Sequence, residues 1–396
     1  MSISESDIPA EARKNERGKE MKRFMRKNGT FYYMRKFLFF AAMAAAILLP
    51  STGPAQPAAA AATEIEWSIP DRPALPSLPA TKAQTTVLEV YPGGDAVAVR
   101  LVCDGAIVLG FSDDGRDNPA RKAGLKEGDR IVGLGNHEID SADTLAAALN
   151  LNGGASVKLK YVRGKKPCET TVTPRKGDDG NWQLGILVKD TTAGIGTLTY
   201  ILPESGAYGC LGHGIGDPDT NQLFCLRQGD LYPARITSVR KGESGTPGEL
   251  QGMFGAPCIG NAEGNTETGL YGRLDPHALS ARSTVPLGDK SEIREGDAVI
   301  RCTLDDGGIR EYTIEIVRIY RTFGGTTKNM LIRVTDPALL EKTGGIVQGM
   351  SGSPILQNGK LVGAVTHVLI NDPTSGYGIF IENMLNADRT LAERAS

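Results

Sequence analysis

The pattern of apolar and polar positions predicts a chain built mostly of short β-strands. Apolar runs at 87–90, 96–102 and 106–111 are separated by turn residues, and 157–162 alternates apolar and polar positions like a half-buried strand. Further apolar runs lie between glycines at 197–202, 298–304, 311–320, 330–334, 360–368 and 378–381. This spacing favours a β-barrel or sandwich over alternating β-α-β units.

Few segments have a helical pattern. Ser141 is predicted to cap a helix over 141–149, and Asn118-Pro119-Ala120 opens a short helical turn. Residues 382–394 form the clearest predicted helix, whereas the glycine-rich stretch 240–265 is predicted to be a loop.

The N-terminal region has the pattern of an export segment. A basic stretch at 1–36 precedes thirteen apolar residues at 37–49, and a run of alanines lies at 58–62. Thirteen residues are short for a membrane span of about 20 and suit a signal peptide. The uncharged residues beyond 49 can also extend the segment to a short anchor, so both interpretations of 37–62 stay open. The basic flank predicts that the rest of the chain is exported, and the prolines of 63–84 predict an extended linker.

Composition and charge narrow the function classes. The chain has 49 glycines and 22 prolines among 396 residues, which indicates many tight turns. Its net charge of -2 combines +5 at residues 1–36 with -7 for the remainder, so the body is not a nucleic-acid binder by charge. The six cysteines form no CxxC pair, which makes a zinc ribbon improbable, and their 15 possible pairings leave the disulfides open.

Residues 118–136, NPARKAGLKEGDRIVGLGN, form the most specific string of the first half. With Val108-Leu109-Gly110-Phe111 upstream, this stretch resembles a PDZ domain of the kind found in bacterial proteases. The resemblance covers roughly residues 83–175, and we assign the domain to 85–175. It implies a peptide-binding module in which residues 108–111 receive a C-terminal carboxylate and an edge strand accepts the peptide.

Nucleophilic chemistry is indicated at Gly349-Met350-Ser351-Gly352-Ser353-Pro354. A serine on a glycine-flanked turn exposes its hydroxyl, and the backbone amides of Gly349 and Ser351 are placed to form an oxyanion hole.

Four histidines are candidates for the base. His213, in LGHGIGD at 211–217, sits in a glycine-flanked turn and is the leading candidate, and His367, in a strand near the nucleophile, is the competitor. His137 and His277 lack supporting context.

The order of these motifs resembles trypsin-like proteases and, more closely, the SpoIVB peptidases of endospore-forming bacteria. The resemblance rests on LGHGIGD, on residues 347–385 and on the PDZ-like string. It implies a mainly β fold, with a PDZ domain (α+β) followed by a trypsin-like β-barrel peptidase domain at 176–396. It also implies a catalytic set of His213, Asp336 and Ser351; Asp217, Asp219 and Asp372 remain alternative acids.

The same resemblance implies a membrane-associated serine endopeptidase made in the forespore. Such an enzyme is exported into the space between the forespore and mother-cell membranes and cleaves itself. It then cleaves a regulatory subunit of the metalloprotease complex that processes the mother-cell sigma factor precursor. No cofactor and no metal are expected. The alternative from another class is an exported PDZ adaptor with an inactive protease-like body.

Overall fold

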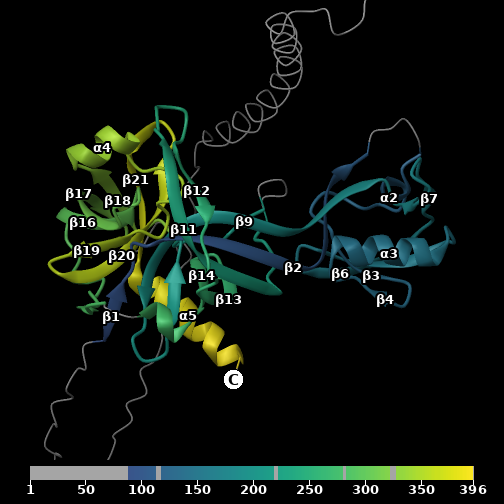
Figure 1. The fold of residues 1–396 in the computed structure, drawn as a ribbon, viewed down its shortest axis with the longest axis horizontal. Coiled ribbons are helices and arrows are strands. Elements are labelled where there is room, and N and C mark those ends of the chain that lie inside the picture. Colours follow the sequence, from purple (N-terminus) through teal and green to yellow (C-terminus); the bar gives the residue numbers. More distant parts are fainter. Residues whose placement is uncertain (1–87, 113–116, 218–221, 280–281, 322–326, 396) are drawn as a thin grey trace, which may run out of the picture. The chain divides into compact units, whose positions relative to one another are not determined.

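The computed structural model describes residues 88–112, 117–217, 222–279, 282–321 and 327–395 (Figure 1). The predicted basic tail, the signal or anchor segment and the linker lie outside these ranges. Within the ranges described, no helix is long and apolar enough to cross a membrane.

Six strands form a ring that makes the first barrel. Each pairs with the next in the order β9, β10, β14, β13, β11, β2, and the pairing of β2 with β9 returns to the start. The apolar side chains inside include Leu101, Leu198, Tyr208, Leu231 and Leu270. The strands are β2 (Ala96–Phe111), β9 (Ile186–Ile201), β10 (Ala207–Cys210), β11 (Gln228–Arg240), β13 (Gly260–Thr266) and β14 (Gly269–Leu274).

A second, closed barrel follows in the sequence, with the strand order β16-β17-β18-β21-β20-β19. Ile300, Ile314, Ile332, Ile355 and Val365 fill its interior. Its strands are β16 (Gly296–Thr303), β17 (Ile309–Ile319), β18 (Met330–Val334), β19 (Pro354–Gln357), β20 (Lys360–Leu369) and β21 (Asp372–Phe380).

The two barrels share a core that the last helix completes. Helix α5 (Ile381–Ala395) places Met384 against Tyr200 and Tyr271 of the first barrel and against Ala364 and Ile379 of the second. Burying aromatic and aliphatic side chains from both barrels fixes their mutual position. The short helix α4 (Pro337–Thr343) connects β18 to the turn that precedes β19.

The PDZ-like segment has its own core, formed around Leu134, Leu145, Leu159 and Leu184. It contains α2 (Pro119–Lys122), β3 (Arg130–Leu134), β4 (His137–Glu138), α3 (Ala142–Asn152), β5 (Val157–Arg163), β6 (Lys166–Val172), β7 (Arg175–Lys176) and β8 (Trp182–Gln183). The remaining elements are β1 (Glu89–Pro92), β12 (Glu249–Phe254), η2 (Pro276–Leu279) and β15 (Val285–Pro286).

The structure draws the domain boundary differently from the predicted 85–175. Residues 97–102 of β2 pair with β11 in the first barrel, and only the later part of β2 enters the PDZ-like core. Strand β9 likewise begins beside the PDZ-like core and ends in the barrel. The PDZ-like segment is therefore inserted between two strands of the first barrel.

The predicted helix starts are confirmed, but the predicted loop at 240–265 is wrong. Asn118 and Ser141 cap α2 and α3 through their side chains. Strands β12 and β13 occupy much of 240–265, and their glycines allow close approach of neighbouring strands. A Cβ at Gly252 would lie 2.6 Å from the Arg235 carbonyl oxygen, and one at Gly260 would lie 2.4 Å from that of Arg273.

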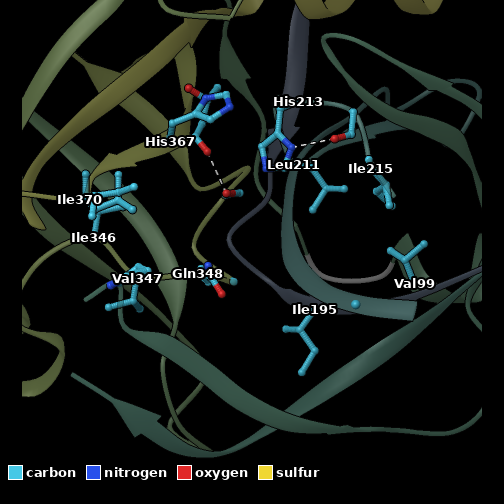
Figure 2. Close-up of a pocket in the computed structure, with 18 residues that line it drawn as sticks. Val99, Ile195, Leu211, His213, Ile215, Ile346, Val347, Gln348, His367 and Ile370 are labelled. Atoms are coloured by element: carbon cyan, nitrogen blue, oxygen red, sulfur yellow. Dashed lines mark hydrogen bonds between the residues drawn. The ribbon is translucent and has the colours of Figure 1, made fainter. Parts of the chain in front are cut away.

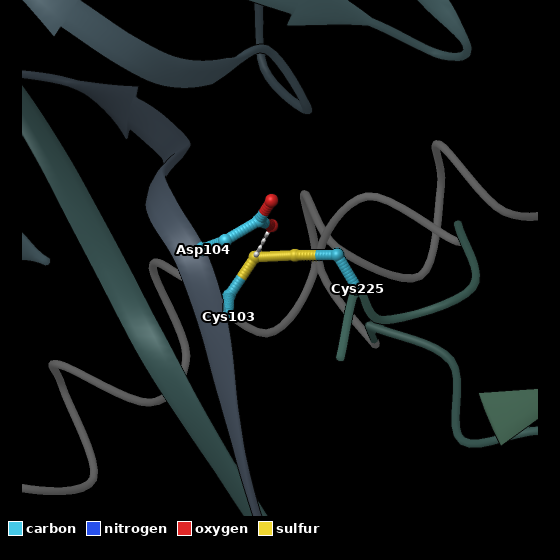
Figure 3. A group of neighbouring side chains, drawn as sticks. All are labelled: Cys103, Asp104 and Cys225. Carbon is cyan, nitrogen blue, oxygen red and sulfur yellow. Dashed lines mark hydrogen bonds between the residues drawn. A yellow bond between two sulfur atoms is a disulfide. The ribbon is translucent and has the colours of Figure 1, made fainter. Parts of the chain in front are cut away.

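One disulfide, between Cys103 and Cys225, links β2 to the segment that leads into β11 (Figure 3). Asp104 lies beside it, but the sulfurs are bonded to each other and the group is therefore not a metal site. The other cysteines, at positions 168, 210, 258 and 302, are free.

Candidate active site

A cavity of about 560 Å³ brings the predicted nucleophile and base together. Ser351 and Gly349 reach it from the turn before β19, and His213 reaches it from the segment after β10. His367 also lines it, from β20 (Figure 2).

The nucleophile turn depends on two glycines in the left-handed region, Gly349 with φ 97° and Gly352 with φ 95°. At Gly352 a Cβ would lie 2.1 Å from the Thr197 carbonyl oxygen and 2.4 Å from the Leu211 nitrogen, so only glycine fits. The turn is thereby pressed against β9.

Two threonines of β9 form hydrogen bonds to this turn. No sequence motif predicted that either of them belongs to the site. The Thr197 hydroxyl donates to the Gly349 carbonyl at 2.9 Å, and the Thr199 hydroxyl donates to that of Gly352 at 2.8 Å. The Thr197 amide donates to the Ser351 carbonyl at 2.9 Å. These bonds hold the three carbonyls on β9, and the oxyanion role of the Gly349 and Ser351 amides stays a prediction.

In this arrangement the Ser351 hydroxyl donates to the Thr366 carbonyl at 2.9 Å. A carbonyl oxygen accepts a hydrogen bond but is too weak a base to remove the proton. This bond therefore holds the hydroxyl beside β20 without making it more nucleophilic. The hydroxyl hydrogen must turn away from the Thr366 carbonyl before it can be donated to an imidazole.

His213 has a defined tautomer. Its Nδ1–H donates to the Gly214 carbonyl at 2.9 Å, since a carbonyl can only accept, and Nε2 is left with a lone pair. Leu211, with φ 71°, and Gly212, with φ 68°, form the sharp turn that presents the ring.

The second imidazole, His367, has its ring centroid 5.2 Å from that of His213. Burial lowers the pKa of His213, and burial together with the charges of His213 and Lys328 lowers the pKa of His367 to about 4. Both rings are therefore neutral near pH 7, as a general base must be.

Asn265 of β13 clamps the segment that carries His213. Its carbonyl oxygen accepts from the Ile215 amide at 2.9 Å, and its amide group donates to the carbonyls of Ile215 at 2.9 Å and Phe224 at 2.8 Å. The ion pair of the largely buried Asp217 with Lys189 ties the same segment to β9. No motif in the sequence marked Asn265 as part of the site.

The predicted acids lie elsewhere. Asp336 caps α4 by accepting from the Ala338 and Leu339 amides at 2.9 and 3.0 Å, and it is not among the described residues that line the cavity. Asp217 is in its ion pair, Asp372 caps the following turn through Thr374, and Asp219 lies outside the described residues. The catalytic role of Asp336 stays a prediction, and the partner of His213 Nδ1 here is a backbone carbonyl.

The remaining histidines lie apart from the cavity. His137 is exposed in β4 and His277 is exposed in η2.

The predicted carboxylate-binding residues Val108, Leu109, Gly110 and Phe111 lie in a strand and not in a loop. These residues lie inside β2, where Gly110 and Phe111 pair with β9, and Val108 bonds on its other side to the chain at 128–129. Their role in binding a peptide carboxylate stays a prediction. Among the described residues of the PDZ-like segment, β6 pairs only with β5, and β9 pairs only with β2 over 186–196.

Comparison with known families agrees with this geometry. The SpoIVB peptidase S55 family matches residues 180–385, just over half of the chain. The chain belongs to the SpoIVB peptidase family. A PDZ domain matches residues 97–173. This SpoIVB-family protein is therefore a PDZ-containing serine endopeptidase, and the family favours the enzyme over an inactive adaptor.

Solved structures resemble parts of this SpoIVB-family peptidase. The PDZ domain of an SdrC-like protein from Listeria innocua is 28% identical over 22% of this chain and 93% of that one, with a TM-score of 0.19. The Rv3671c protease of M. tuberculosis, in an inactive form, is 16% identical, and the match covers 50% of this chain and 84% of that one, with a TM-score of 0.28. The HtrA-type protease AlgW with a decapeptide is 14% identical, and the match covers 52% of this chain and 54% of that one, with a TM-score of 0.32. No curated protein matches the chain.

The pH dependence of activity of this SpoIVB-family peptidase should reflect the lowered pKa of the buried His213. Because burial lowers the pKa of His213, its neutral form persists to lower pH, and activity is lost only as the pH falls through that lowered value. We expect the acidic limb of kcat/KM to lie below about pH 6.5, the usual pKa of histidine. His367→Gln should keep this limb, and a limb at or above pH 7 in the wild type would contradict the assignment.

Asn265→Ala should lower kcat by about 10- to 100-fold with little change in KM, because a small displacement of a catalytic group is costly. The matched control is Asn261→Ala, an exposed asparagine of the same strand. Steady-state kinetics, corrected for the folded fraction by circular dichroism, check this. An unchanged kcat in folded Asn265→Ala would show that the clamp does not position His213.

Proposed function

We propose that this peptidase acts in sporulation, in the space between the forespore and mother-cell membranes. There it cleaves itself and then a regulatory subunit of the membrane metalloprotease complex that activates the mother-cell sigma factor. The observation that carries its chemistry is the meeting of Ser351 and His213 at one cavity. The family's name supports the sporulation setting.

The geometry supports acyl transfer by a serine. After rotation away from the Thr366 carbonyl, the Ser351 hydroxyl attacks the scissile carbonyl carbon while His213 Nε2 takes its proton. The amides of Gly349 and Ser351 stabilise the oxyanion. The amine then leaves with the proton from His213, and water releases the acyl group by the reverse sequence of proton transfers.

Export is supported by two independent features of the chain. The N-terminal sequence has a basic flank and an apolar block of signal-peptide type. The disulfide between Cys103 and Cys225 is a bond that persists in oxidising compartments and is rare in the cytosol. The PDZ-like segment would bind a peptide from a partner or from the same chain at the β9 edge.

Self-cleavage tests this function directly. Wild-type protein should accumulate a form that begins within residues 63–84, and Ser351→Ala should lose it, since loss of the nucleophile costs on the order of 10³ to 10⁶ in rate. Ser353→Ala is the matched control, because Ser353 is buried two residues further on and faces the Cys302 thiol instead of the cavity.

N-terminal sequencing of the accumulated forms reads out the result, and incubation with the regulatory membrane protein extends it to the partner. Self-cleavage that persists in Ser351→Ala would contradict the proposal, as would a mature end far inside residue 100.

A further inference from the structure

The cavity beside Ser351 is lined by aliphatic side chains and, among the described residues, by no Asp, Glu, Lys or Arg. Figure 2 shows two walls. Ile346, Val347 and Ile370 lie to the left of Gln348 in this view, and Leu211, Ile215, Val99 and Ile195 lie to its right. Val368 also lines the cavity, from the same strand end as Ile370.

The position of the oxyanion hole assigns the two walls to the two halves of a substrate. The scissile carbonyl oxygen faces the Gly349 amide, so the residue on the acyl side lies next to the segment 346–349 and the strand end 366–370. The leaving nitrogen must reach His213, and it therefore lies toward the wall that carries Leu211 and Ile215.

The chemistry of the acyl-side wall selects its occupant. An aliphatic side chain that binds there is removed from water, which lowers the free energy by roughly 25 cal/mol per Å² of buried apolar surface. A charged side chain would lose its hydration without finding a partner of opposite charge, which is the costlier exchange. The two imidazoles are neutral near pH 7, so they provide no counter-charge for an acidic residue. Lys328, whose charge helps to lower the pKa of His367, does not line the cavity.

We propose that this peptidase cleaves after a large aliphatic residue, whose side chain fills the pocket formed by Ile346, Val347, Val368 and Ile370. The substrate class is thus an extended polypeptide with an uncharged, apolar residue before the cut. This inference rests on the proposed nucleophile Ser351 and names the specificity of the same site.

A mixture of peptides that differ only at the residue before the cut tests the pocket. With purified wild-type protein, kcat/KM for Leu, Ile or Val should exceed that for Lys, Arg, Asp or Glu by about 100-fold or more. Mass spectrometry of the products locates each cut.

A variant that introduces a negative charge makes the test specific to this wall. Ile370 is 57% exposed, so Ile370→Asp should fold, and it places a carboxylate in the pocket. We expect it to raise kcat/KM for Lys and Arg by about 10-fold and to lower that for Leu. Leu151→Asp is the matched control, since Leu151 is 75% exposed on α3 and lies outside the cavity lining; it should change neither value.

The outcomes separate the two levels of the account. Wild-type cleavage after charged residues as fast as after Leu overturns the pocket and leaves the peptidase intact, as does an unchanged preference in folded Ile370→Asp. No cleavage of any peptide, in the mixture or in the self-cleavage assay, overturns the proposed function and the inference together.

Discussion

The close contact between the nucleophile turn and strand β9 is the constraint on which the site depends. Gly352 has no room for a Cβ because the Thr197 carbonyl lies in its place, and Thr197 and Thr199 bond to the carbonyls of the turn. This contact joins the two barrels at the predicted nucleophile Ser351. It also holds the carbonyls of Gly349, Ser351 and Gly352 on β9.

Strand β9 links this contact to the rest of the molecule. Its first half pairs with β2 beside the PDZ-like core, and its second half carries the threonines that hold Ser351 in place. Lys189, in the same strand, pairs with Asp217 four residues after His213. One continuous element therefore contacts the PDZ-like segment, the turn that carries Ser351 and the segment that carries His213.

In this structure a backbone carbonyl accepts the hydrogen bond of the Ser351 hydroxyl. The Ser351 hydroxyl donates to the Thr366 carbonyl and His213 Nδ1–H donates to that of Gly214, so Nε2 of His213 remains able to accept a proton. Asn265 makes three hydrogen bonds to backbone groups and so fixes the position of the segment that carries His213. In a catalytic triad a carboxylate fixes the orientation of the imidazole ring itself.

Local patterns predicted the local features well. Ser141 and Asn118 have cap chemistry that depends on residues within four positions, and both caps are present. The motifs around His213 and Ser351 predicted that the two residues act together, and both line one cavity. Features set by distant contacts were not predictable in the same way. Gly252 supports a strand because of a neighbour seventeen positions away, and Gly110 is paired with a strand more than seventy positions later.

The same reason explains the missed site residues and the open cysteine question. Thr197 meets the nucleophile turn only in the folded barrels, and Cys225 meets Cys103 only because β2 and β11 are neighbours. The burial that lowers the pKa of His213 is likewise a property of the packed cavity and has no local sequence signal.

The central claim is that Ser351 is the nucleophile and His213 its base, and covalent labelling tests it most directly. A fluorophosphonate that reacts with activated serines should form one adduct, on Ser351, in the wild-type protein. His213→Gln should slow its formation by about 10³-fold or more, whereas His367→Gln should slow it far less. An adduct on another serine, or labelling of Ser351 at the wild-type rate in His213→Gln, would contradict the account.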